Sequence, residues 1–124
     1  MNLTILKQRL LDFDPDVSWL EQTDEQMGDG FEKHARERLD AYNRGEWGMV
    51  GVRVVATLTD ERGFSKVVES GGLWGIESDS DDAYFEEVAF EEWMVLREEV
   101  LKAVDNETFL RADLTFNEAE WEDQ

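Results

Sequence analysis

Residues 50–59 place the strongest constraint on the fold, because apolar and other residues alternate along the whole segment. One set of alternate positions is entirely apolar: Val50, Val52, Val54, Ala56 and Leu58. Successive side chains of a strand point to opposite faces, so the pattern predicts a strand with one well-buried face. The loop at 60–63 predicts a hairpin to a return strand at 64–69. With a short third strand at 73–76, we expect an antiparallel meander over residues 48–77.

Residues 82–104 have the spacing of a long helix instead. At 100° per residue, a core-facing stripe is formed by Phe85, Val88, Ala89, Trp93, Leu96 and Val100. Phe90, Met94 and Leu101 lie beyond the edge of this stripe, so the apolar arc is too wide for a helix that packs on one side only. These residues either pack under the C-terminal tail or contact a partner.

The remaining segments complete a single predicted domain over residues 1–124. Helices are expected within 3–45, the first from the spacing of Leu3, Leu6 and Leu10 and the second over 31–43. The segment 105–124 is expected to hold a further strand near 108–116 and a loose tail. The predicted fold class is α+β, with a small antiparallel sheet of three to four strands and helices packed on one face.

The chain is strongly acidic, with 31 Asp and Glu against 12 Lys and Arg and a net charge of −19. Residues 77–124 hold 17 acidic and 3 basic residues, which is −14 of that total. Such a field attracts basic protein surfaces and repels nucleic acid and anionic membrane surfaces. Solubility of a small domain needs a net charge of only about 2–8. The excess therefore indicates either a binding function or a saline habitat.

The acidity is concentrated in residues 77–92, which contain eight carboxylates and no Lys or Arg. The acids up to Asp82 are explained by helix capping and by the helix dipole, but both act only near the first turn. Glu87 and Glu91 stand at i,i+4, where like charges repel. The helix face is therefore either a negative ridge that docks on a basic surface or merely a solvated face. The candidate partner-binding residues are Glu77, Asp79, Asp81, Asp82, Glu86, Glu87, Glu91, Glu92, Phe90 and Met94.

No motif for catalysis or metal binding competes with this interpretation. The chain has no cysteine and a single histidine, His34, so acyl-transfer chemistry has no basis. The run from Asp79 departs from a calcium loop, because Ala83, Tyr84 and Phe90 stand at its fifth, sixth and twelfth positions. We expect no enzyme activity, no metal and no cofactor. A hydrolase that uses paired carboxylates is a further alternative, and it requires a pocket with acids of perturbed pKa.

Two segments of the chain resemble uncharacterised small acidic proteins of bacterial phages, plasmids and integrated elements. One is 70–81, followed by Tyr84 and the acidic helix, and the other is 37–47. The segment Gly-Leu-Trp-Gly-Ile-Glu-Ser-Asp-Ser-Asp at 72–81 carries most of this resemblance. It implies a mobile-element context. By composition the chain also resembles anti-restriction and anti-CRISPR proteins, which inhibit host defence by imitating the charge of DNA.

Together these observations predict a non-enzymatic binding protein of a mobile element that inhibits a nucleic-acid-binding defence system of its host. The expected partner is a basic protein surface, with no direct contact to nucleic acid or membrane, and a homodimer through Phe90 and Met94 is left open. The absence of a signal-peptide pattern at the N-terminus predicts a cytoplasmic location in the host cell. The alternative is an accessory or structural protein whose acidity serves solubility or a saline habitat.

Overall fold

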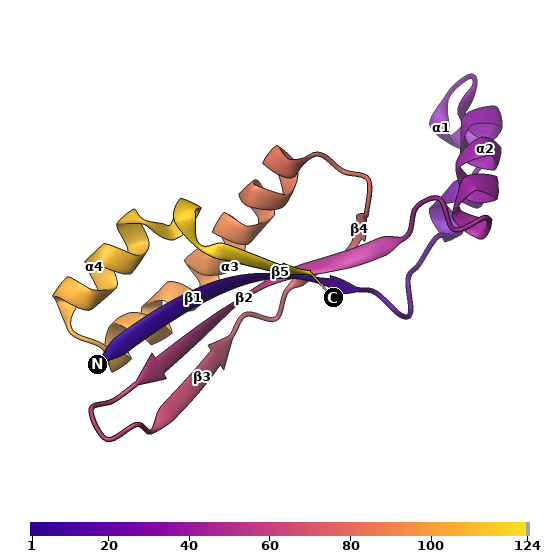
Figure 1. Ribbon diagram of the computed structural model, residues 1–124. Coiled ribbons are helices and arrows are strands. Elements are labelled where there is room, and N and C mark those ends of the chain that lie inside the picture. The colour runs from indigo at the N-terminus through magenta and orange to yellow at the C-terminus, as the bar shows by residue number, and fades with distance from the viewer. Residues whose placement is uncertain (124) are drawn as a thin grey trace.

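The computed structural model describes residues 1–123 and combines a five-stranded sheet with helices (Figure 1). Its elements, in chain order, are β1 Asn2–Leu11, η1 Ser18–Glu21, α1 Asp24–Met27, α2 Phe31–Asn43, β2 Met49–Thr59, β3 Ser65–Glu69, β4 Leu73–Glu77, α3 Asp82–Ala103, α4 Asn106–Leu114, η2 Phe116–Glu118 and β5 Glu120–Asp123. The α+β class is confirmed.

The sheet differs from the expected meander. Its order is β3-β2-β1-β5, and β4 pairs with β2 instead of β3. The long strand β2 pairs with β3 through residues 55–59 and with β4 through residues 49–52. Strand β5 runs parallel to β1, so the sheet is mixed and has one strand more than the expected maximum.

In two segments of the chain, a strand and a helix are exchanged relative to the expectation. The N-terminal helix is wrong, because Asn2–Leu11 form strand β1, whose ten residues all pair with β2. The strand near 108–116 is also wrong, because Asn106–Leu114 form helix α4, which Asp105 caps by accepting a hydrogen bond from the Thr108 amide at 3.0 Å. In both cases long-range packing or a cap decides between two patterns that the local sequence permits.

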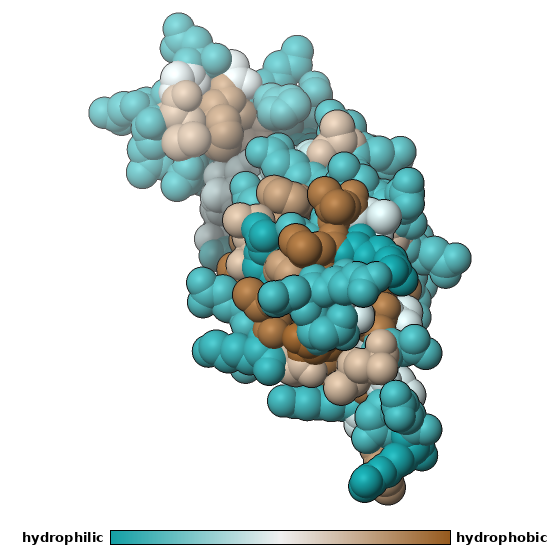
Figure 2. Space-filling view, turned by 90° about the vertical axis from the view of Figure 1, so that its left-hand side faces the viewer, coloured by the Kyte–Doolittle hydropathy of each residue, from teal (hydrophilic) through white to brown (hydrophobic). Residues whose placement is uncertain are grey.

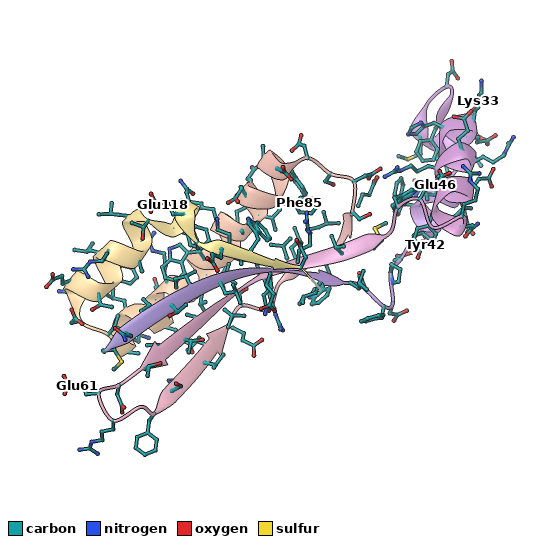
Figure 3. All side chains as sticks on the ribbon, viewed as in Figure 1. Lys33, Tyr42, Glu46, Glu61, Phe85 and Glu118 are labelled. Carbon is teal, nitrogen blue, oxygen red and sulfur yellow. The ribbon has the colours of Figure 1, made fainter. Side chains whose placement is uncertain are left out.

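Helix α3 is confirmed together with its predicted core stripe, since all six stripe residues are buried. They belong to one buried cluster with Val52, Val54, Ala56 and Leu58 of β2. Figure 3 labels one of the six, Phe85 of α3. Trp93 lies at the centre and stacks on Phe109 and Phe116 at ring-centroid distances of 6.2 and 5.6 Å. Helix α4 and η2 are thereby attached to the same side of the sheet as α3 (Figure 1).

Helices α1 and α2 lie beyond the end of the sheet, where β2 begins (Figure 1). Helix α2 packs with η1 and the start of β2 around a second, smaller cluster of buried residues, Leu20, Ala35, Trp47 and Met49. The side chain of Arg38 connects this cluster to the loop before α3. Its guanidinium lies 3.8 Å from the centre of the Trp47 ring, and it also contacts carboxylates of that loop.

Candidate protein-binding face on helix α3

The first carboxylates of the acidic window are bound within the fold. Arg38 forms a bidentate pair with Asp79, at 2.6 Å for each contact, and it also donates hydrogen bonds to Glu77. The hydrogen bond to Asp79 raises the pKa of Arg38 and holds the pKa of Asp79 below its ordinary value. Glu77 and Asp79 therefore hold the α2 region against the main sheet.

Asp81 performs the capping role that the sequence predicts. Its side chain accepts a hydrogen bond from the Tyr84 amide at 2.8 Å, and α3 begins at the next residue. Asp82, in the first helical turn, is exposed and carries the negative charge that favours the start of a helix.

Glu86 lies on the flank of α3 that faces β1 and the C-terminal segment. It accepts a hydrogen bond from Lys7 at 2.8 Å and another from the indole of Trp121 at 2.6 Å. Lys7 is completely buried, and its ammonium also donates to the Asn117 carbonyl and lies 5.0 Å from the centre of the Phe116 ring. Burial alone raises the pKa of Glu86, but the hydrogen bonds from Lys7 and Trp121 outweigh it and lower that pKa. Glu86 thus compensates a buried cation.

The outward side of α3 has a different character. Glu87 and Glu91 are exposed, and Glu98 extends their line two turns further along the helix. We call these three residues the acidic ridge. Within residues 1–123, no ion pair is formed by any residue of the acidic ridge. Glu92 is half-buried at the opposite flank of the same helix, next to exposed Glu99.

Phe90 and Met94 lie between the acidic ridge and helix α4. The Phe90 ring meets Phe116 edge-on at 6.1 Å, and the Met94 sulfur lies 3.0 Å from Nη1 of Arg97. Packing against the C-terminal segment, one of the two predicted alternatives, is seen for Phe90, while 44% of Phe90 and of Met94 remains exposed. A partner contact stays a prediction. Arg97 in turn binds Asp113 of α4 at 2.9 Å, which joins the two helices.

Sequence reasoning missed several residues that decide this arrangement. Lys7 and Arg38 neutralise acids of the window from strands and helices far away in the chain. Leu110 and Leu114 of α4, expected in a strand, are exposed beside α3. One signal was present in the sequence. Lys7 lies between the apolar segments 3–6 and 10–11, and if both belong to one strand with a buried face, the lysine requires a buried partner.

The described residues include no group of three or more His, Cys, Asp or Glu side chains placed to hold a metal ion. Every carboxyl group among them whose pKa is clearly shifted, namely Asp16, Glu46, Asp79, Glu86 and Asp105, is shifted downward by hydrogen bonds or ion pairs. That direction stabilises the ionised form, whereas a general acid working near neutral pH needs a raised pKa.

None of the helices in residues 1–123 has the length and apolar content needed to cross a membrane. The chain matches no protein-family model, no curated protein and no solved structure, so its interpretation rests on its own residues and their geometry.

Proposed function

We propose that this protein is a non-enzymatic binding protein that engages a basic surface of a nucleic-acid-binding protein through the acidic ridge. One observation carries the proposal. Lys7 binds Glu86, and Arg38 binds Glu77 and Asp79. The acidic ridge, in contrast, has no ion-pair partner in residues 1–123. Glu87 and Glu91 repel each other, no carboxylate of the ridge forms an ion pair inside the described fold, and a basic partner would supply the missing partners.

The ridge is ordered, which favours binding. Helix α3 is held by its buried stripe, including the completely buried Trp93 and Val100. The backbone positions of its glutamates are therefore fixed, and the protein loses less conformational freedom on binding than a flexible acidic tail would. A partner would meet the ridge carboxylates at fixed spacings, about 6 Å from Glu87 to Glu91 and about 10 Å from Glu91 to Glu98 along the helix axis.

These spacings define what the ridge can imitate. A single DNA strand carries one charge per about 3.4 Å, so α3 offers a lower charge density than the nucleic acid. The ridge would occupy one cluster of Lys and Arg side chains that normally hold a few phosphates, and it would not imitate a whole duplex. A defence complex of a bacterial host is the partner that best suits the mobile-element resemblance.

The test is affinity capture from a bacterial lysate at about 50 mM and about 500 mM salt, where screening differs strongly. The ridge variant replaces Glu87, Glu91 and Glu98 with Gln and keeps Glu86, since Lys7 needs it. The matched control replaces Glu21, Glu25 and Glu37, which are exposed and remote from α3, and so makes the same change in net charge. We expect the native protein and the control to retain nucleic-acid-binding proteins at low salt, released by duplex DNA, and the ridge variant to retain none.

Equal loss in the ridge variant and in the control would contradict the proposal, because only total charge would then matter. That result would instead support acidity that serves solubility or a saline habitat. Capture that persists at high salt would contradict the charge-based mechanism directly.

A further inference from the structure

Exposed apolar side chains occur on both helices of the α3–α4 pair. They are Phe90, Met94 and Leu101 of α3, exposed to 44, 44 and 41%, and Leu110 and Leu114 of α4, exposed to 54 and 83%. The end of the molecule that faces the viewer in Figure 2 shows such a gathering of hydrophobic residues surrounded by hydrophilic ones. Single exposed apolar residues are common on protein surfaces, but a contiguous group is typical of an interaction site.

The junction is a groove with a rigid floor. A hollow of about 280 Å³ is lined by Met94, Arg97, Glu98, Leu101 and Phe109. Asp113 holds the floor together, because it accepts hydrogen bonds from the Trp93 indole at 2.8 Å and from Arg97 at 2.9 Å. The groove is therefore already formed before anything binds, which lowers the entropic cost of binding.

The sequence spacing on α3 gives this groove a direction. Phe90, Met94 and Leu101 stand at i, i+4 and i+11, and Arg97 fills the i+7 position of the same line. This line is straight along the helix and about 16 Å long, which equals about three turns of a helix laid beside it. Phe109 of α4 forms the second wall, and Leu110 and Leu114 are exposed at i and i+4 on the same helix.

The acidic ridge runs directly beside this apolar line. Glu87, Glu91 and Glu98 share their helical line with Met94, which belongs to both lines. A ligand seated in the groove would therefore place its apolar side on the floor and one polar flank against three carboxylates. Cationic side chains on that flank are the complementary chemistry.

We propose that the groove between α3 and α4 binds a basic amphipathic helix, which presents an apolar stripe to Met94 and Leu101 and Lys or Arg side chains to the acidic ridge. The inference rests on the proposed function and states which part of the basic partner is recognised. Amphipathic helices commonly dock in hydrophobic grooves in this way, and a flexible methionine adapts the floor to differing side chains.

A second copy of the chain suits the groove less well. Two copies paired through this face would bring their acidic ridges close together, and each chain carries a net charge of −19. Like charges placed opposite each other at an interface oppose association. The same ridge repels the phosphates of nucleic acid and of anionic lipid.

The probe is a labelled synthetic peptide of about 18 residues, with Leu on one helical face and Lys on its flanks. A scrambled peptide of the same composition keeps the charge and loses the apolar face. Binding is measured by fluorescence anisotropy at about 50 mM salt, and helix formation by circular dichroism. We expect the patterned peptide to bind about tenfold more tightly than the scrambled one and to become helical on binding.

Variants separate the groove from the ridge. L101S removes a groove side chain that is 41% exposed, so the fold should survive, and it should weaken the patterned peptide about tenfold while leaving the scrambled one unchanged. M94Q tests the floor independently and should act in the same direction. V95S is the control, because Val95 is 74% exposed on α3 but lies off the groove line. The ridge variant E87Q/E91Q/E98Q should weaken both peptides.

Equal affinity for the two peptides, unaffected by L101S and M94Q, would overturn the groove but leave the proposed function standing if the ridge variant still weakened binding. An unchanged affinity in the ridge variant, or no binding of either peptide, would overturn both. Sedimentation of the protein alone tests the remaining occupant, a second copy of the chain. A dimer that L101S dissociates would show that a second copy, and not a basic helix, occupies the groove.

Discussion

Glu86 and Glu87 are neighbours in the chain but belong to regions with opposite properties. The inner flank of α3, together with the loop before it, holds acids that bind Lys7, Arg38 and the Trp121 indole. The outward face holds the acidic ridge, whose three residues form no ion pair within residues 1–123. A rotation of 100° about the helix axis is enough to separate an acid that stabilises the fold from one that opposes it. The number of acids in a window therefore says little about how many are available for binding.

The largest predicted difference between the two regions is in stability. Glu86→Gln removes the charge opposite the completely buried Lys7 and should lower the free energy of unfolding by about 2 kcal/mol. The effect stays moderate because glutamine still accepts a hydrogen bond and because Glu86 is partly exposed. Glu87→Gln, the matched control one residue away, should change stability by less than about 0.5 kcal/mol. Urea unfolding of both variants measures the difference.

The difference in stability between the native protein and Glu86→Gln should depend on pH. In the folded protein the pKa of Glu86 lies below its ordinary value of 4.5. Its contribution is therefore present above that ordinary value and is lost as the pH falls through the lowered pKa. The gap between the native protein and Glu86→Gln should be widest above pH 4.5 and should close in more acidic solution. A gap that stays constant down to pH 3 would show that the carboxylate charge is not what stabilises Lys7.

The second largest predicted loss of stability concerns the contacts of Arg38 with the loop before α3. Arg38→Met removes the cation that holds Glu77 and Asp79 and that packs on Trp47, and should destabilise α2 by about 1–2 kcal/mol. Arg36→Met is the control on the same helix, because Arg36 is exposed and forms no ion pair within residues 1–123. Amide hydrogen exchange should show faster opening of α2 in Arg38→Met alone, with α3 unchanged. Equal protection of α2 in both variants would mean that the guanidinium does not anchor this helix.

The sequence predicted the parts of the molecule whose pattern is local. The alternation at 50–59 and the stripe of α3 are each decided by residues within a few turns or positions of one another, and both are confirmed. Strand β1 was missed because Leu3, Leu6 and Leu10 satisfy helical spacing, and only pairing with β2 selects the strand. The same limit applies to the candidate site. Glu87 and Glu91 were identified from their own helix, whereas the partners of Glu86 and Asp79 come from residues 79 and 41 positions away.

The smallest predicted effect has the opposite sign from the largest. Glu91→Gln removes the repulsion between Glu87 and Glu91 at i,i+4 and should raise the free energy of unfolding by about 0.3 kcal/mol at low salt. The gain should disappear at high salt, where exposed charges are screened. Glu98→Gln is the control within the acidic ridge, because its i+4 neighbour is Lys102, so the substitution loses an attraction and should not stabilise. Chemical denaturation at two salt concentrations distinguishes these outcomes. If both variants gained stability equally, the total charge of the chain, and not the local crowding of the ridge, would be the source of the repulsion that a basic partner relieves.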